Sequence, residues 1–296
     1  MDNTLQSMIQ GLNDYFSKNG CIIEPAYDFP VGAGTFYPVC FFGSLNKDDM
    51  AVAYVAPSRR PKDGRYGENP IRWQRFFQYQ VLYKPPLDDI QRVYLNSLSA
   101  IGIPINKHDI RFVEDDWESP SLGATGLGWQ VWLDGIEISQ FTYFQRMGGQ
   151  KLDRITVELT YGLERIAIFL QGAKSMKDIS LNEGFKYGST YLQMEKENCK
   201  FNFEEADIDL LRQHYLLWKV EARRLLGKRL LYPAYDLLLC QSHYFNILDA
   251  RGALGVKERQ GFIQEIRGLA RDIAEAYLKG LKEEEGIVDL AEFQEV

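Results

Sequence analysis

The segment PSRRPKDGRYGENPIRWQRFFQYQVLYKP, residues 57–85, carries most of the information about the fold. Seven of its residues are Lys or Arg and two are Asp or Glu, so the segment is strongly positive in a chain whose net charge is -7. Cations concentrated in one short segment indicate a site that holds an anion. The first half is dense in Gly and Pro, which predicts a long loop between two strands.

The second half of the segment alternates as a strand does from Arg72 onwards, so side chains of one parity share a face. One face is mostly apolar and is interrupted by Arg75. The other face presents a cation, an aromatic ring and three amides: Arg72, Gln74, Phe76, Gln78 and Gln80. A solvated face would favour Lys, Glu or Thr, so this face predicts a ligand-binding surface. The alternative is an ordinary hairpin with a basic tip.

Length and composition are those of a globular protein, and 296 residues can form two domains. No apolar run is long enough to cross a bilayer and the N-terminus lacks a signal-peptide pattern, so we expect no membrane and a cytoplasmic location. The four cysteines and three histidines are scattered without a metal-ligand spacing. A pI of about 5.2 is untypical of a stand-alone nucleic-acid-binding protein.

Periodicity along the chain predicts the fold class. Helices are expected over 5–16, closed by Gly20, and over 88–101. Strands are expected at 21–23, 51–56, 72–83, 110–113 and 154–161, with a loop of small residues over 119–128. Residues 129–144 form a hairpin around Asp134-Gly135, a pair typical of a type I′ turn. From about 204 the chain is expected to be helical.

The predicted fold class is therefore α+β: an antiparallel sheet flanked by helices and followed by an all-helical C-terminal domain. We divide the chain into a catalytic domain at 1–175 and a helical domain at 176–296. The G-x-x-G-x-G pattern in the 119–128 loop lacks the strand-Gly-helix context of a dinucleotide site and the Lys of a P-loop.

Three polar strand faces need a common purpose: the one from Arg72, one on the hairpin with Glu137 and Gln140, and one with Arg154, Thr156, Glu158 and Thr160. Arginines bind phosphates with their planar forks, and Phe76 could stack on a nucleobase. Glu137 could hold Mg²⁺ between phosphates, and Glu158 could pair with an ammonium group. Such a site would bind ATP and a small amino acid together.

Several strings carry a family resemblance. Arg60, a loop and Arg72-x-x-x-Phe76 resemble motif 2 of class II aminoacyl-tRNA synthetases, and TYGLER, ending at Arg165, resembles motif 3. The N-terminal helix through Pro25 is compatible with motif 1. Longer strings resemble the α subunit of heterotetrameric bacterial glycyl-tRNA synthetase: VGAGTF (31–36), RFVEDDWESPSLGATGLGWQVWLDGIE (111–137), QFTYFQ (140–145), ELTYGLERIA (158–167) and YFNILDARGALGV (244–256).

The resemblance implies a role for each matching residue. Arg60 would contact the α-phosphate of ATP and the amino acid carboxylate, and Phe76 would stack on adenine. Arg72 and Arg165 would meet the β- and γ-phosphates, so Arg60 and Arg165 are the expected catalytic residues. Glu137 would help to hold Mg²⁺. The residues expected to bind glycine are Gln78, Gln80, Gln140 and Glu158.

One pair of assignments is in tension with strict alternation. Glu137 and Gln140 are three residues apart, which would put them on opposite faces of a strand. Either a bulge lies between them or one assignment is wrong.

The resemblance also implies partners. We expect a homodimer of this chain, a companion β subunit, and tRNA(Gly) bound mainly through β, because the chain outside the basic segment is acidic. Trp117 and Trp129 are expected to pack, and Glu114, Asp115 and Asp116 to cap a loop. The rival interpretation is a catalytically silent paralogue that only binds and regulates a partner.

Overall fold

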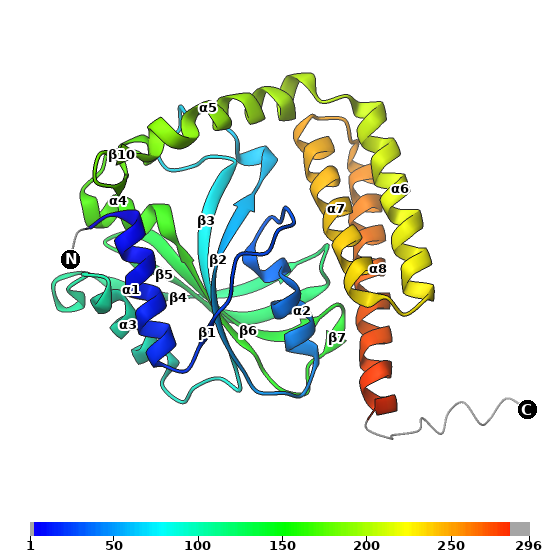
Figure 1. Ribbon diagram of the computed structural model, residues 1–296, viewed down its shortest axis with the longest axis horizontal. Helices are drawn as coiled ribbons and strands as arrows, with labels where there is room; N and C mark the ends of the chain where they lie inside the picture. Colours follow the sequence, from blue (N-terminus) through cyan, green and yellow to red (C-terminus); the bar gives the residue numbers. More distant parts are fainter. Residues whose placement is uncertain (1–2, 285–296) are drawn as a thin grey trace, which may run out of the picture.

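The computed structural model describes residues 3–284 (Figure 1). Within that range an eight-stranded sheet has the order β1-β2-β3-β8-β6-β5-β4, with β7 paired to β6. Every pairing is antiparallel except β1 with β2. The strands are β1 (Ile22–Ile23), β2 (Met50–Arg59), β3 (Arg75–Lys84), β4 (Ile110–Ser119), β5 (Ala124–Leu133), β6 (Ile136–Met147), β7 (Gln150–Lys151) and β8 (Val157–Gly162). The predicted α+β class is confirmed.

Helices flank the sheet and make up the second half of the chain (Figure 1). They are α1 (Leu5–Lys18), α2 (Pro38–Leu45), α3 (Ile90–Ala100), α4 (Leu163–Gln171), α5 (Tyr187–Lys200), α6 (Ile208–Gly227), α7 (Leu231–Ala250) and α8 (Val256–Glu284). A two-stranded ribbon, β9 (Ser180–Asn182) with β10 (Phe185–Lys186), precedes α5. In the described residues no helix is long and apolar enough to cross a membrane.

Helix α1 follows its sequence signals closely. Thr4 caps its N-terminus by accepting a hydrogen bond from the Ser7 amide at 3.2 Å, and Gly20 takes the positive φ of 87° beyond its end. The apolar stripe of α1 is buried in the chain's own core, with Leu12 and Phe16 fully covered. Of the stripe Leu5, Met8, Ile9, Leu12 and Phe16, only Ile9 is partly exposed, so little of it is accessible to a second copy of the chain.

The hairpin between β5 and β6 confirms the turn prediction. Asp134 and Gly135 have φ values of 47° and 84°, as a type I′ turn requires. Both strands extend beyond the hairpin predicted at 129–144: β5 begins at Ala124 and β6 ends at Met147. Glu137 and Gln140 therefore lie on β6 close to this turn, where β6 begins to pair with β8.

The two faces of the sheet have different covers. One face packs on α1, α3 and α4, and the other packs on α2, α7 and α8. On the second face Tyr235 of α7 stacks on Phe41 of α2 with ring centroids 4.5 Å apart, and its hydroxyl donates to the Phe36 carbonyl at 2.9 Å. The C-terminal helices therefore share a core with the sheet. The division into domains at 1–175 and 176–296 stays a prediction.

The structure corrects three sequence predictions of local structure. β3 begins at Arg75, so Arg72 and Gln74 precede the strand. β4 and β5 extend to Ser119 and from Ala124, which replaces most of the predicted 119–128 loop with paired strands. β8 begins at Val157, and Arg154 lies outside it, where it pairs with Asp49. Arg154 is therefore absent from the polar face on which we expected it.

Candidate active site

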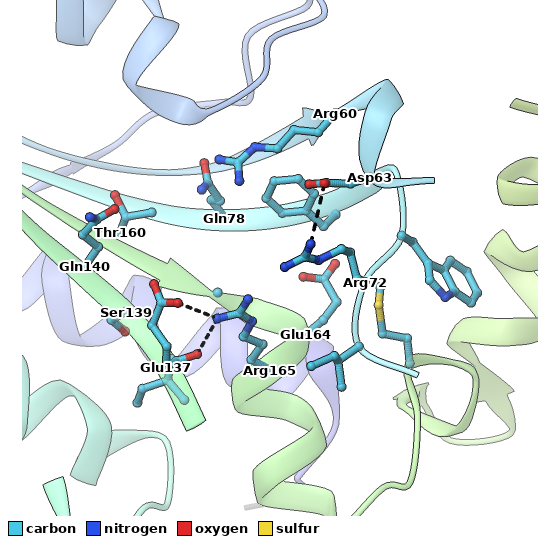
Figure 2. Close-up of a pocket in the computed structure, with 16 residues that line it drawn as sticks. Arg60, Asp63, Arg72, Gln78, Glu137, Ser139, Gln140, Thr160, Glu164 and Arg165 are labelled. Atoms are coloured by element: carbon cyan, nitrogen blue, oxygen red, sulfur yellow. Dashed lines mark hydrogen bonds and ion pairs between the residues drawn. The ribbon is translucent and has the colours of Figure 1, made fainter. Parts of the chain in front are cut away.

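Two adjoining pockets lie on the face of the sheet that α7 borders. The first, the arginine pocket, is lined by Arg60, Asp63, Ile71, Arg72, Trp73, Phe76, Gln78, Glu137, Ile138, Ser139, Gln140, Thr160, Gly162, Glu164, Arg165 and Met176 (Figure 2). The second, the glutamate pocket, is lined by Gly32, Ala33, Thr35, Phe36, Arg60, Gln78, Trp117, Glu118, Ser119, Pro120, Ser121, Gln140, Glu158, Thr160, Ser242 and Asn246. Arg60, Gln78, Gln140 and Thr160 line both.

Arg60 stands at the boundary of the two pockets. It directly follows β2, and its Nε donates to the Gly32 carbonyl at 2.9 Å. Its guanidinium carbon lies 4.9 Å from the centre of the Phe76 ring, in cation–π contact. The β2–β3 register places Ser58 opposite Phe76, so the ring and Arg60 come together at the end of the hairpin. A planar base and a phosphate could therefore be held side by side.

Arg72 and Arg165 enter the arginine pocket from different elements and face carboxylates there (Figure 2). Arg72, on the β2–β3 loop, lies 4.0 Å from Asp63 Oδ1. Arg165, in the first turn of α4, donates from Nη1 to Glu137 Oε2 at 3.0 Å and to the Glu137 carbonyl at 2.8 Å. Half-exposed ion pairs contribute little free energy, so a phosphate can compete for both guanidinium groups.

The bulge that the sequence left open exists. In the β5–β6 register Val131 pairs with Ser139 and Trp132 pairs with Glu137, so Ile138 is the extra residue on β6. The bulge brings Glu137 and Gln140 to the same pocket, in which both were expected. Nearby, Gln140 Nε2 donates to Asp115 Oδ2, and Gln78 Oε1 accepts from the Gly34 amide at 2.9 Å.

Glu158 of β8 is the buried acid of the glutamate pocket. Its side chain is 2% exposed, and its carboxylate oxygens lie 2.9 and 2.8 Å from the Thr35 hydroxyl. The Thr160 hydroxyl lies 3.2 Å from Oε2. Burial raises the pKa of Glu158 to about 7, and among the described residues no cation forms an ion pair with it. A cationic ligand in this pocket could therefore form an ion pair with the carboxylate.

Some expected residues take other positions. Gln80 is fully buried beneath Gly34, accepts a hydrogen bond from Thr160 at 2.6 Å and lines neither pocket. Trp117 both packs on Phe144 and lines the glutamate pocket, so the packing expectation was incomplete. Arg65 is a loop residue whose guanidinium donates to the Lys62 and Gly64 carbonyls.

Sequence reasoning missed four contributors to the site. Thr35 sits in the short 3₁₀ turn Gly34–Phe36, and only the string VGAGTF pointed to it. Asp115 supports Gln140 from β4, although we expected it to cap a loop. Ser242 and Asn246 reach the glutamate pocket from α7, far along the chain. Asn246 belongs to the string YFNILDARGALGV, but nothing local in that string shows that the helix borders a pocket.

The residues fit a magnesium ion shared with a ligand. Among the described residues no group of three or more His, Cys, Asp or Glu side chains is placed to hold a metal. Mg²⁺ is, however, usually held by one or two carboxylates together with substrate phosphates. Glu137 is a carboxylate at the wall of a pocket that also holds three arginines, so it fits that donor set.

The chain is similar to known proteins over most of its length. The model of the family described as "Glycyl-tRNA synthetase alpha subunit" matches residues 5–282. A "Glycine--tRNA ligase alpha subunit" from Petrotoga mobilis is 51% identical over 274 residues, which cover 93% of this chain and 96% of that protein. Two structures of pyrrolysyl-tRNA synthetase from Desulfitobacterium hafniense are similar at TM-scores of 0.43 and 0.45, with 14% and 12% identity, each over 62% of this chain and 75% of that one.

Proposed function

This chain belongs to the glycyl-tRNA synthetase alpha subunit family, and we propose that its two pockets bind ATP and glycine next to each other. It is a ligase that activates glycine with ATP to glycyl-adenylate and, with a β subunit, transfers glycine to tRNA(Gly). The observation that carries the assignment of the two pockets is that Arg60, Gln78, Gln140 and Thr160 line both. Two substrates bound there would meet at their reacting ends.

ATP is assigned to the arginine pocket. Phe76 would stack on adenine, Arg60 would bind the α-phosphate, and Arg72 and Arg165 would bind the β- and γ-phosphates. Arginine suits this task because its fork binds phosphate oxygens in pairs. Arg72 and Arg165 would exchange Asp63 and Glu137 for phosphate as ATP binds.

Glycine is assigned to the glutamate pocket. Its ammonium group would pair with Glu158, while Gln140 and Gln78 would orient it through their amides. Gln80, also predicted to bind glycine, would act indirectly, because its side-chain oxygen accepts a hydrogen bond from the Thr160 hydroxyl that lines the pocket. Trp117 and Phe36 line the same pocket, so they would limit the room for a side chain.

The reaction requires alignment and charge neutralisation. A glycine carboxylate oxygen attacks the α-phosphorus, the bond from that phosphorus to the bridging oxygen breaks, and pyrophosphate leaves with the electron pair. Arg60, at the boundary of the pockets, would neutralise charge on the α-phosphate, and Arg165 charge on the leaving group. No proton needs to be removed from the carboxylate. Mg²⁺ held by Glu137 and the phosphates would supply further charge neutralisation.

Partners and location complete the proposal. tRNA(Gly) would be bound mainly through β, because this chain is acidic outside residues 57–85. A homodimer is also proposed, with a light-scattering mass at micromolar concentration as its test. Because four of the five residues of the α1 stripe are buried within the chain, most of that interface would have to come from other residues. A cytoplasmic location agrees with four cysteines that are all free thiols.

Glycine-dependent exchange of labelled pyrophosphate into ATP tests the proposed function. The full-length chain with its β subunit should catalyse exchange with glycine and much less with alanine, because the pocket walls exclude an added methyl group. A folded protein that binds ATP but catalyses no exchange would be the silent paralogue, and the proposed chemistry would be wrong.

A further inference from the structure

The loop between β2 and β3, residues 60–74, carries Arg60 and Arg72 of the arginine pocket and packs directly on α5. A Cβ added at Gly64 would lie 2.6 Å from Cys199 Sγ, which is too close for any side chain. Gly67, with φ of 76°, lies against Leu192 in the same way. The backbone of the loop therefore packs on one face of α5, which crosses the top of the molecule in Figure 1.

Glu195 lies at the centre of this α5 face. Its side chain is 2% exposed and accepts backbone hydrogen bonds from the middle of the loop and from its last residue. Oε1 accepts from the Arg65 amide at 3.3 Å, and Oε2 accepts from the Gln74 amide at 3.1 Å. The Cys199 thiol donates to Oε1 at 3.3 Å. The carboxylate thus joins two points that are nine positions apart in sequence.

The peptide at Gln74 extends this connection to the pocket. Its amide donates to Glu195, and its carbonyl accepts from the Arg60 amide at 2.7 Å. Arg72 lies two residues before Gln74, and Phe76 lies two residues after it. One buried acid therefore fixes the backbone from which three side chains of the arginine pocket extend.

We infer that Glu195 is a positioning residue for ATP: it holds the β2–β3 loop closed so that Arg60, Arg72 and Phe76 converge on one ligand. The inference rests on the proposed function, because it takes ATP as the occupant of the arginine pocket. Glu195 lines neither pocket and touches no substrate. Hydrogen bonds from neutral amides to a buried carboxylate are strong, so this one side chain can order a long loop.

A purely structural role would have a different signature. If Glu195 only attached α5 to the rest of the protein, its loss would lower stability and affect both substrates alike. If it positions the loop, its loss raises the KM for ATP much more than the KM for glycine, because Arg60, Arg72 and Phe76 line the ATP pocket and only Arg60 of these also lines the glycine pocket. In the part of the chain that the structure describes, the hydrogen-bond partners of Glu158 are Thr35, Cys40 and Thr160, which lie outside α5, so its own position should not change.

The test is Glu195→Gln in the full-length chain assayed with its β subunit. The amide keeps the shape but turns one acceptor oxygen into a donor, which faces a backbone N–H. We expect the KM for ATP in pyrophosphate exchange to rise about tenfold, and the KM for glycine to rise about threefold or less, through Arg60 alone. Glu195→Asp, which keeps the charge on a shorter side chain, should give a smaller rise.

Leu211→Ala is the control for lost stability. Leu211 is buried in a separate cluster of α6 and α7 and lines neither pocket. This variant should lower the melting temperature without a selective change in either KM. Equal rises in both KM values for Glu195→Gln, or none, would overturn the inference.

Hydrogen exchange gives a readout that is independent of catalysis. The Arg65 and Gln74 amides should lose protection in Glu195→Gln while amides in β6 and β8 keep theirs. Unchanged protection at both amides would contradict the inference. If the wild-type protein showed no glycine-dependent exchange of pyrophosphate into ATP, the proposed function would be wrong. Hydrogen exchange at the Arg65 and Gln74 amides would still decide whether Glu195 orders the loop.

Discussion

The arginine pocket and the glutamate pocket share a wall but hold their charges in opposite ways. In the arginine pocket the side chains of Arg72 and Arg165 are 55% and 33% exposed, and each faces a carboxylate. In the glutamate pocket Glu158 is 2% exposed and has only hydroxyl and thiol neighbours. A ligand entering the first pocket replaces an existing partner. A ligand entering the second provides a charge that the protein lacks.

This difference affects which substrate each residue controls. An exposed ion pair contributes about 0–1 kcal/mol, so exchanging Asp63 or Glu137 for a phosphate costs little. A buried carboxylate without a cation is expensive, and its cost is relieved when an ammonium group arrives. Phosphate binding should therefore depend on several arginines together, whereas ammonium binding should depend on one residue.

The largest expected effect is that of Arg165→Ala on adenylate formation. The substitution removes a cation that faces the leaving pyrophosphate and leaves Glu137 in the pocket without its partner. We expect the exchange rate to fall by about 10²–10³-fold, the usual cost of losing one donor to developing charge. Thermal melting should be close to that of the wild type. A folded variant with near-normal exchange would show that the arginine pocket does not bind the phosphates.

Glu158→Gln tests the other pocket. The amide keeps the shape but cannot balance an ammonium charge. We expect the KM for glycine to rise about 10–100-fold and the KM for ATP to stay within about threefold, since a hydrogen bond to a charged group is worth about 1.5–3 kcal/mol. Equal rises in both KM values would contradict the contrast between the pockets and would mean that Glu158 supports the site as a whole.

The pH dependence of glycine binding should sharpen this contrast. Burial raises the pKa of Glu158 to about 7, so in the free enzyme the acid takes up a proton as pH falls through that value. The protonated acid cannot pair with ammonium, so the KM for glycine should rise below about pH 7, approaching tenfold per pH unit. Glu158→Gln should remove that dependence.

Two neighbouring groups must be separated from Glu158 in this measurement. The Cys40 thiol is 3.7 Å away, but burial raises its pKa well above the ordinary value, so it stays neutral. Burial also raises the pKa of Glu164, in the arginine pocket, to about 7. A pH dependence of the KM for glycine that persisted in Glu158→Gln would assign the titration to a group other than Glu158.

The smallest effect is expected from Asp63→Asn. Asp63 Oδ1 is 4.0 Å from Arg72 Nη1, and both side chains are partly exposed. Removing a competitor of this kind should lower the KM for ATP by about twofold or less. A rise of tenfold in this KM would mean that Asp63 positions Arg72 instead of competing for it.

Local signals in the sequence were sufficient for much of the fold and for most of the pocket walls. The Asp134-Gly135 turn, the helix ended by Gly20 and the strand with Gln78 depend on neighbours in sequence, and the structure has all three. Arg60, Arg72, Phe76 and Arg165 came from the resemblance to motifs 2 and 3 of class II synthetases, and they line one pocket.

Contacts between distant segments could not be read from the sequence. Alternation identifies a strand but not the point at which a bulge resets it, so Glu137 and Gln140 were in conflict until the Ile138 bulge was located. Glu195 lies in α5, within the region 176–296 that was expected to be helical but without a helix of its own being predicted there, and its partners are backbone amides without a sequence signal. The roles assigned to individual site residues remain predictions.

The apolar core shared by the sheet and the C-terminal helices has a consequence for protein synthesis. Phe41 and Phe42 leave the ribosome long before Tyr235 and the α8 residues that cover them. Because folding proceeds as the chain emerges, this face of the nascent sheet stays uncovered until the last helices appear. We expect ribosome-bound chains that end before α7 to bind chaperones through this uncovered apolar face and to form no adenylate.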